Sequence, residues 1–317
     1  MRLLFELSGE HPDLPFSELE CVGRVLEQAT QVAIAEIPDP KTTERLALTH
    51  TVMEYLGSCP ADLEAFAGLL EDLAIHTDRP FAGRAKKMHD STIPGKQLDL
   101  ERLIGTKIEG PVSLTAPQET YRVLCAGNRC FFGRVITTID RGSFEYRNPM
   151  RRAFFHPGVM LPILARTLVN LSQAQKNDTV LDPFCGTGGV LLEAETLGMR
   201  TCGFDMDQAM IVGARENLPD AELGIADATA LPLRDAFADA VVTDLPYGQS
   251  VCIRGDNMER LYHQSLKEIR RVLKQDHRAV VVTHKDIREI AAEYFDISDF
   301  FSQRVHKSLT RRIMVLT

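Results

Sequence analysis

The chain has 317 residues, enough for two or three domains that each bury a hydrophobic core. Its contents of 44% hydrophobic and 25% charged residues are typical of a soluble globular protein. No apolar stretch approaches the roughly 18 residues of a membrane span, and the charged amino terminus favours a first strand over a secretion signal.

The formal net charge of −8 is unevenly distributed. Residues 1–78 contain four basic and fifteen acidic side chains, which leaves 32 basic and 29 acidic side chains in the rest of the chain. The later basic residues form two clusters: Arg79, Arg84, Lys86, Lys87 and Lys96, and then Arg141, Arg147, Arg151 and Arg152. Phosphate binding depends on local potential, so the acidic total does not exclude an RNA substrate.

Seven cysteines are scattered along the chain without any C-x-x-C pair. This pattern predicts reduced thiols in a cytoplasmic protein and no zinc site built from cysteine pairs, so we expect no metal. Cys185 lies inside a glycine-rich stretch and is interpreted there as a small packing residue, since no basic partner is close in sequence.

The first 139 residues predict a small α/β unit followed by a second module. Their expected elements are a strand at 2–8, helix 16–26, strand 31–37, helix 46–56, helix 61–75, strand 80–88, helix 98–104 capped by Gly105, and strands 112–114, 121–125 and 130–136. The polar residues 140–149 are predicted to form a linker.

The rest of the chain alternates regularly between helices and strands, which predicts an α/β fold with a parallel sheet covered on both faces. The expected helices are 159–171, 190–197, 208–217, 258–273 and 287–294, and the expected strands are 179–181, 201–204, 223–226, 238–243, 279–283 and 312–316.

A glycine-rich turn, Asp182-Pro-Phe-Cys-Gly-Thr-Gly-Gly189, follows the first of these strands. Glycines permit a tight turn and close approach to a ligand. A dinucleotide fingerprint would need glycine at position 191, which is Leu191, so a nucleoside cofactor without a pyrophosphate, such as S-adenosylmethionine, fits better.

Acidic residues end the next two strands of the same pattern. Asp205 is placed to accept hydrogen bonds from ribose hydroxyls, and Asp227-Ala228 to bind the adenine amino group. Each aspartate has the alternative role of helix N-cap. The candidate cofactor residues of this region are Asp182, Phe184, Gly186, Thr187, Gly188, Asp205, Met206, Asp227 and Ala228.

A second short motif, Asp244-Leu-Pro-Tyr-Gly248, follows the strand predicted at 238–243. The Asp244 carboxylate and the Leu245 carbonyl are candidates to accept the two hydrogens of an exocyclic amine, holding its nitrogen in line with a methyl donor. Pro246 stiffens the loop, and Tyr247 offers a ring on which an extruded base can stack. The alternative interpretation is an ordinary strand-to-turn sequence.

The two motifs together resemble those of class I amino-methyltransferases with an N/D-P-P-Y motif. The segments Arg151-Arg-Ala-Phe-Phe-His-Pro-Gly158 and Arg304-Val-His-Lys-Ser-Leu-Thr-Arg311 are similar to the archaeal THUMP-domain tRNA guanosine-N2 methyltransferases acting at position 10. This resemblance implies a Rossmann-like methyltransferase domain and assigns His156 and Pro157 to the methionine part of the cofactor. Leu245 replaces the family's first proline, which affects loop rigidity more than the carbonyl contact.

Upstream, Pro80-Phe-Ala-Gly-Arg-Ala-Lys-Lys-Met88 resembles a diverged THUMP module. The resemblance implies a ferredoxin-like domain at 1–58, a THUMP RNA-binding domain at 59–139, a linker at 140–157 and a methyltransferase domain at 158–317. The candidate RNA-binding residues are Arg79, Arg84, Lys86, Lys87, Arg151 and Arg152, with a merely solvated charged surface as the alternative.

The expected function is therefore methylation of a guanosine 2-amino group in tRNA by a monomeric cytoplasmic enzyme. The residues leave open an adenine amino-methyltransferase, a non-catalytic tRNA-binding protein and a nicotinamide dehydrogenase. They also leave open a small zinc-binding activator subunit, the number of methyl groups added, and the roles of His306 and Arg311.

Overall fold

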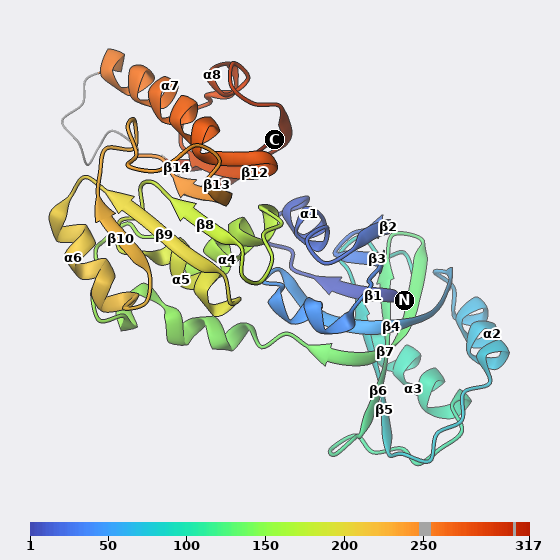
Figure 1. Cartoon of the computed structure of the whole chain (residues 1–317). Helices are drawn as coiled ribbons and strands as arrows, with labels where there is room; N and C mark the ends of the chain where they lie inside the picture. Colours follow the sequence, from blue (N-terminus) through green and yellow to red (C-terminus); the bar gives the residue numbers. More distant parts are fainter. Residues whose placement is uncertain (247–254, 307–308) are drawn as a thin grey trace. The chain divides into compact units, whose positions relative to one another are not determined.

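The computed structural model describes residues 1–246, 255–306 and 309–317 (Figure 1). The chain forms two compact units, Met1–Asp140 and Arg141–Thr317, and each is described by itself. In the described part of the chain, we find no helix with the length and apolar character that a membrane span requires.

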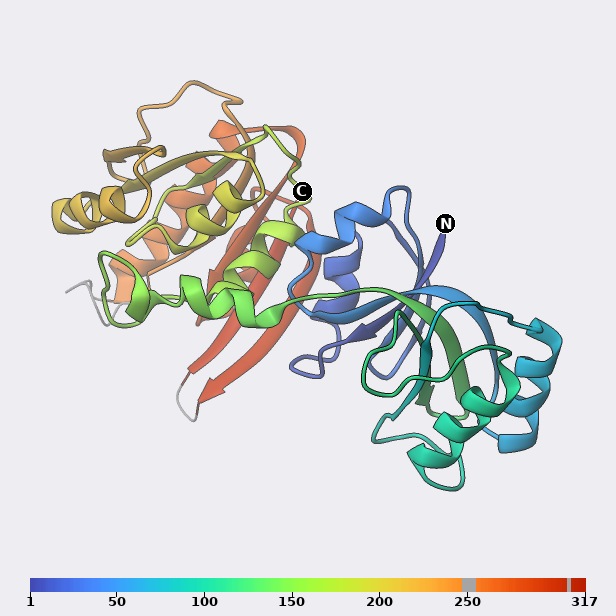
Figure 2. The same cartoon turned by 90° about the horizontal axis from the view of Figure 1, so that it is seen from below.

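The first unit is built on a seven-stranded sheet with the order β2-β3-β1-β4-β7-β6-β5. Its strands are β1 (Arg2–Leu7), β2 (Arg24–Ala29), β3 (Val32–Glu36), β4 (Thr49–Pro60), β5 (Phe81–Lys87), β6 (Glu119–Ala126) and β7 (Arg129–Thr138). Its helices are α1 (Leu14–Leu19), the 3-10 helix η1 (Pro40–Arg45), α2 (Leu63–Leu73) and α3 (Gln97–Lys107). The helices α2 and α3 lie together on one face of this sheet (Figure 2).

One sheet runs through both of the modules expected in this unit. The expected boundary at residue 58 lies inside β4, which pairs with β1 on one side and with β7 on the other. Cys59 on β4 and Cys125 on β6 are both register partners of Cys130 on β7, and the Cys125 and Cys130 sulfurs are 3.1 Å apart. Cysteines that are scattered in the sequence therefore meet in the fold.

The helix predicted at 46–56 is wrong, because most of this segment is strand β4. Its register shifts near Val52 and Met53, and these neighbours pack into different hydrophobic clusters on the two faces of the sheet. A strand buried on both faces loses its alternating pattern and can imitate the apolar spacing of a helix.

Three smaller predictions in the first unit are also wrong. Helix α1 ends at Leu19, and the remainder of the predicted 16–26 helix turns at Gly23 into β2, where a Cβ at Gly23 would lie 2.3 Å from the Glu36 carbonyl oxygen. Helix α3 continues through Gly105 to Lys107 and is capped by Ile108. The segment 112–114 forms only an isolated bridge between Val112 and Phe81.

The second unit contains another seven-stranded sheet, with the order β10-β9-β8-β11-β12-β14-β13. Its strands are β8 (Thr179–Asp182), β9 (Arg200–Asp205), β10 (Glu222–Ile225), β11 (Ala238–Asp244), β12 (Leu273–Thr283), β13 (Ile297–His306) and β14 (Leu309–Leu316). Its helices are α4 (Pro162–Leu171), α5 (Gly189–Thr196), α6 (Gln208–Asn217), α7 (Gly255–Val272) and α8 (Arg288–Ala291).

The sheet of the second unit is covered on both faces, as expected. Helices α4, α5 and α6 lie on one face, and α7 and α8 lie on the other (Figures 1 and 2). The expectation of a wholly parallel sheet is wrong at one edge, because β14 runs antiparallel to β12 and pairs with β13, a strand that was not predicted. The segment 141–151, expected as part of a linker, holds the 3-10 helices η2 (Arg141–Arg147) and η3 (Pro149–Arg151).

Candidate functional site

The site is built at the carboxyl ends of the central strands of the second sheet. Strands β10, β9, β8 and β11 are parallel neighbours, so their carboxyl ends meet at one edge. Asp182 ends β8, Asp205 ends β9 and Asp244 ends β11. Open α/β sheets bind their ligands at this edge.

The glycine turn between β8 and α5 depends on two left-handed residues. Gly186 has φ of 49° and Gly188 has φ of 81°, a region that L-residues rarely adopt. The Gly186 N–H donates to Asp205 Oδ2 at 2.9 Å, which ties the turn to the end of β9. Among the residues that the structure describes, no atom lies within 4 Å of a Cβ built on Gly186, whereas a Cβ on Gly188 would lie 2.4 Å from Leu218 Cδ1. Gly186 therefore borders open space, and Gly188 is packed.

The position that lacks the third glycine of a dinucleotide fingerprint is filled by a buried leucine. Leu191 on α5 packs against β9, and its Cδ1 lies 2.5 Å from where a Cβ on Gly203 would be. In a dinucleotide-binding fold, a glycine on the helix lets the helix approach the strand closely. Here the glycine is Gly203 on the strand, and Leu191 on the helix packs against it. This packing supports the prediction that the turn is not a dinucleotide fingerprint.

Asp182 is the most strongly perturbed carboxyl of the site. It is buried, and its Oδ1 accepts hydrogen bonds from Thr243 Oγ1 at 2.7 Å and from the Phe184 N–H at 3.1 Å. Burial, with added repulsion from Asp244 and Asp205, raises the pKa of Asp182 to about 7, against the lowering effect of the hydrogen bonds from Thr243 and Phe184. The structure therefore brings these three acids together.

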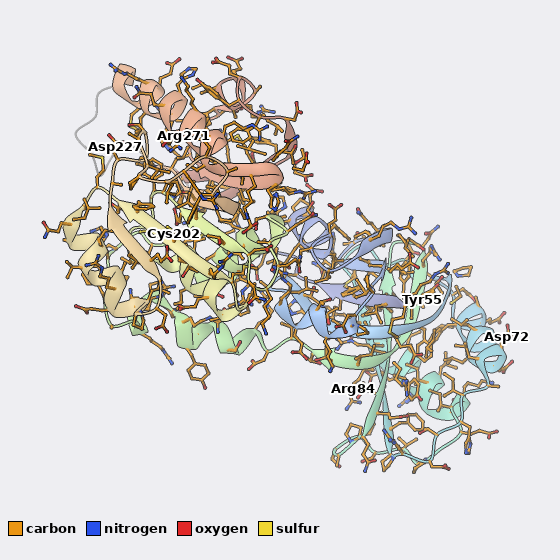
Figure 3. The ribbon with its side chains drawn as sticks, in the orientation of Figure 1. Tyr55, Asp72, Arg84, Cys202, Asp227 and Arg271 are labelled. Carbon is orange, nitrogen blue, oxygen red and sulfur yellow. The ribbon has the colours of Figure 1, made fainter. Side chains whose placement is uncertain are left out.

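Asp205 is not a helix N-cap, the alternative that the sequence left open. Its Oδ1 accepts the Asp207 N–H at 2.9 Å, and Asp207 itself caps α6. A carboxylate has about four acceptor positions, so Asp205 retains capacity for ligand hydroxyls. Asp227 lies beyond the carboxyl end of β10 (Figure 3), where its Oδ1 accepts the Thr229 N–H at 2.9 Å.

The other candidate cofactor residues of this edge differ in exposure. Met206 is 69% exposed, Ala228 is buried, and Phe184 is partly buried against the core. Thr187 is also buried, and its carbonyl accepts Asn217 Nδ2 at 3.0 Å. Burial raises the pKa of the Cys185 thiol, as expected for a packing residue without a basic partner.

The loop after β11 is held by two contacts that the sequence did not predict. The Leu245 N–H donates to the Val282 carbonyl at 2.9 Å, and the Leu245 side chain is buried in the core. The Tyr262 hydroxyl of α7 donates to the Pro246 carbonyl at 3.1 Å. Tyr247 lies outside the described residues.

The segment before α4 contains both exposed and buried candidates. His156 and Pro157 are exposed, and His156 Nδ1 lies 2.9 Å from the Pro157 carbonyl oxygen. Arg151 is exposed and lies 3.6 Å from Glu145. Arg152, in contrast, has buried Nη1 and Nη2 atoms, which contradicts its expected exposure to an RNA phosphate.

The basic residues predicted on β5 are already engaged within the first unit. Lys86 Nζ lies 2.7 Å from the buried Glu6, and Lys87 Nζ donates to the Ile93 carbonyl at 2.6 Å. Arg84 on β5 (Figure 3) donates to the Leu114 carbonyl, and Arg79 remains largely exposed.

Two further residues left open by the sequence lie in the last hairpin. Arg311 on β14 pairs in register with Gln303 on β13, and the side chain of His306 lies outside the described residues. Within the described ranges, no three His, Cys, Asp or Glu side chains are arranged to hold a metal ion.

Comparison with known proteins gives the family. The family described as "RMKL-like, methyltransferase domain" matches residues 149–313. A tRNA (guanine(10)-N2)-dimethyltransferase of Methanothermobacter thermautotrophicus is 34% identical over 100% of this chain and 99% of its own length. The chain belongs to the tRNA (guanine(10)-N2)-dimethyltransferase family. A second dimethyltransferase of the same name, from Methanocaldococcus jannaschii, is 30% identical and covers 98% of both chains.

The fold of this dimethyltransferase family member also resembles a solved structure. TrmN from Thermus thermophilus aligns over 100% of this chain and 99% of its own, with a TM-score of 0.56 at 22% identity. The Rossmann-like methyltransferase sheet expected from the sequence is confirmed.

Residues of this dimethyltransferase family member fit a nucleoside cofactor. The open space at Gly186 lies in the turn, the carboxylate of Asp205 keeps free acceptor positions, and Asp227 follows the next strand. These features suit a ribose and an adenine.

Proposed function

We propose that this chain is an S-adenosylmethionine-dependent methyltransferase that modifies the 2-amino group of the guanosine at position 10 of tRNA, in two successive transfers. The gathering of Asp244 with Asp182 and Asp205 next to the open glycine turn carries this proposal. Family membership supports the substrate, because the relatives with full-length similarity are named for this dimethylation.

Cofactor binding falls to the residues around the glycine turn. S-adenosylmethionine supplies the methyl group. Asp205 accepts the ribose hydroxyls, Asp227 accepts the adenine amino group, and the backbone of Ala228 lies next to it. His156 and Pro157 are assigned to the methionine part.

The reaction needs a positioned amine more than a strong base. The guanine 2-amino lone pair is delocalised into the ring, so two acceptors that hold its hydrogens direct it in line with the methyl group. Asp244 is the side-chain acceptor, and the Leu245 carbonyl is the backbone acceptor. With bound S-adenosylmethionine supplying the methyl group, Asp244 would take up the proton that the amine loses.

Two anchors support the loop that carries these acceptors. The Leu245 N–H is bound to β12, and the Pro246 carbonyl is bound to the Tyr262 hydroxyl. These anchors compensate for the missing first proline, because they restrict the backbone from outside the loop. Tyr247 is assigned to stacking on the extruded guanine.

We assign tRNA recognition to the first unit, in which one sheet joins the ferredoxin-like part expected at 1–58 to the THUMP part expected at 59–139. We place a linker at 140–157 before the methyltransferase domain 158–317. Arg79 is the most available of its candidate phosphate contacts, and Arg84, Lys86 and Lys87 keep side-chain donors beyond their internal bonds. Arg151 is the corresponding candidate in the second unit. The enzyme is expected to be a cytoplasmic monomer.

A methyl-transfer assay tests this function. The purified chain is incubated with labelled S-adenosylmethionine and either tRNA or duplex DNA, and the nucleosides are analysed by mass spectrometry. We expect N2-methylated and N2,N2-dimethylated guanosine from tRNA alone. Methylated adenine would support the adenine alternative instead.

An Asp244→Asn variant separates the enzyme from a non-catalytic tRNA-binding protein. We expect the variant to bind tRNA normally and to lose methyl transfer by more than about a hundredfold. A matched control is Asp235→Asn, which changes an exposed aspartate in the same unit. Full activity of the Asp244→Asn variant would refute the mechanism, and binding of a nicotinamide dinucleotide would favour the dehydrogenase.

A further inference from the structure

The side chain of Arg152 lies against Gly189, the first residue of α5, next to the glycine turn. Its Nη1 is 3.0 Å from the position that a Cβ on Gly189 would occupy. The Nε donates to the Arg147 carbonyl at 3.0 Å. Both Nη1 and Nη2 are buried and have no hydrogen-bond partner among residues 1–246, 255–306 and 309–317. A buried guanidinium with two unused ends is costly unless something binds them.

The backbone that carries Arg152 is held firmly. The Phe154 N–H donates to Asn217 Oδ1, and Asn217 Nδ2 donates back to the Phe154 carbonyl, each at 3.0 Å. The Phe154 ring covers Gly213, where a Cβ would lie 2.1 Å from the ring. Because Asn217 also binds the Thr187 carbonyl, one side chain joins the Arg152 segment to the glycine turn.

The buried acid Glu193 is bound directly by other arginines. Glu193 is fully buried on α5, and Arg147 binds it through Nε at 2.7 Å and Nη2 at 3.3 Å. Arg166 Nη2 lies 2.8 Å from the same carboxylate. Two guanidinium groups already bind this single negative charge directly, so Arg152 is attracted to Glu193 only in competition with them. Burial lowers the pKa of Arg152, the charge of Glu193 raises it, and the charge of Arg147 lowers it.

The direction of the unused nitrogens limits what they can bind. They adjoin the first residue of α5, where free backbone N–H groups add a positive potential. The guanidinium charge and the start of the helix therefore both favour an anion at this place. Because these nitrogens are buried beside the glycine turn, a group on a ligand seated in the turn suits them better than a phosphate on an exposed RNA backbone.

We propose that Arg152 binds the α-carboxylate of the methionine part of S-adenosylmethionine, an inference that rests on the proposed function. The planar guanidinium offers two parallel N–H donors that match a carboxylate. Arg152 is thus a cofactor-binding residue and not the RNA contact expected from the sequence. Its charge selects ligands that carry the amino-acid moiety over shorter adenosine thioethers.

The experiment compares the affinities of two ligands by calorimetry. S-adenosylhomocysteine carries the carboxylate, and 5′-deoxy-5′-methylthioadenosine lacks the whole amino-acid part. We expect Arg152→Met to weaken S-adenosylhomocysteine about tenfold to a hundredfold and to change methylthioadenosine by less than about twofold. Arg200→Met is the matched control, because Arg200 is exposed and its Nε also donates to a backbone carbonyl, that of Asn177.

Thermal unfolding gives a second readout without turnover. Since the free protein holds an unpaired buried charge, Arg152→Met should melt no lower than the parent, yet gain less stability from S-adenosylhomocysteine. Equal weakening of both ligands together with a lower melting temperature would indicate a purely structural role and overturn the proposal. Unchanged affinity for S-adenosylhomocysteine would overturn it as well.

A last comparison needs no variant. The parent protein should bind S-adenosylhomocysteine at least about tenfold more tightly than its decarboxylated analogue, and equal affinities would refute the role of Arg152 even if Arg152→Met does not fold. If the parent binds none of these adenosine ligands, the proposed function fails together with this inference. Binding by the parent with no effect of the variant refutes the inference alone.

Discussion

Gly188→Ala should lower the stability of the protein more than Gly186→Ala does, whereas Gly186→Ala should weaken cofactor binding more than Gly188→Ala does. Both residues have left-handed backbones, so each alanine carries a similar conformational cost. Their surroundings differ, because a Cβ on Gly186 enters open space and one on Gly188 meets Leu218 at 2.4 Å. Comparing the two variants therefore separates the space that the cofactor needs from the space that core packing needs.

The expected magnitudes follow from these contacts. A left-handed alanine costs about 1–2 kcal/mol at either position. Gly188→Ala also displaces the fully buried Leu218, and such overpacking adds about 1–3 kcal/mol. In a unit of this size, about 1 kcal/mol lowers the melting temperature by roughly 2–4 °C, so Gly188→Ala should melt several degrees below Gly186→Ala.

The two variants should rank in the opposite order in their affinity for the cofactor, with Gly186→Ala as the weaker binder. The methyl group of Gly186→Ala enters the space that we assign to the cofactor, and we expect its affinity for S-adenosylhomocysteine to fall at least about tenfold. Both variants are measured by calorimetry and by thermal unfolding in the same buffer. Parental affinity in Gly186→Ala would mean that the open side of the turn does not receive the cofactor, and the reasoning would be refuted.

Three further changes test the supports of the site. Tyr262→Phe removes the hydrogen bond to Pro246, worth about 1 kcal/mol, and should lower kcat about fivefold with little change in the KM for S-adenosylmethionine; a change confined to KM would contradict this role. Glu193→Gln leaves the buried Arg166 and the partly buried Arg147 without their shared charge and should cost about 3–5 kcal/mol in calorimetric unfolding, whereas the exposed Glu216→Gln should cost less than about 0.5 kcal/mol; equal losses would refute the network around the buried Glu193. Because the pKa of Asp182 is raised to about 7, the folded protein keeps a proton that the unfolded chain releases near pH 4, so this contribution to stability is complete below about pH 4 and is lost as the pH rises through 7. Asp182→Asn should therefore melt progressively higher relative to the parent between pH 5 and pH 8, and parallel melting curves would contradict the raised pKa.

The second unit was largely predictable from local pattern. Helix α6 was expected at 208–217 and occupies those residues, and the central parallel strands fall within a few residues of their predictions. Each of these elements has a clear period and is bounded by an acid or a glycine. The final hairpin is harder to predict from the sequence. Its strand β13 carries phenylalanines and polar residues without strict alternation and obtains its stability from pairing with β14.

The first unit shows the limit of periodicity. Strand β4 was interpreted as a helix because neighbouring residues face different cores, and a bulge breaks its alternation. The burial of both faces depends on strands far away in sequence, such as β7. Local spacing contains no information about such partners.

The acids of the site could be predicted, but their supports could not. Aspartates directly after buried strands are visible in the sequence, because the topology brings strand ends to one edge. The Phe154–Asn217 contact joins residues 63 positions apart, and the Tyr262–Pro246 contact depends on how α7 packs. For Arg152, sequence proximity to exposed Arg151 suggested an RNA contact, and only the packing against Gly189 shows its burial.

The charges around the glycine turn form a pattern that suits a zwitterionic ligand with an additional positive charge. Asp182, Asp205 and Asp244 gather at the strand ends, and their mutual repulsion is relieved by a cation more than by a neutral molecule. Arg152 lies on the α5 side of the same turn and requires an anion. A sulfonium and a carboxylate on one small molecule satisfy both demands, whereas the thioether left after methyl transfer satisfies only the second. With the residue roles that we propose, the site favours the donor over its product through the acids, and it holds both through the arginine.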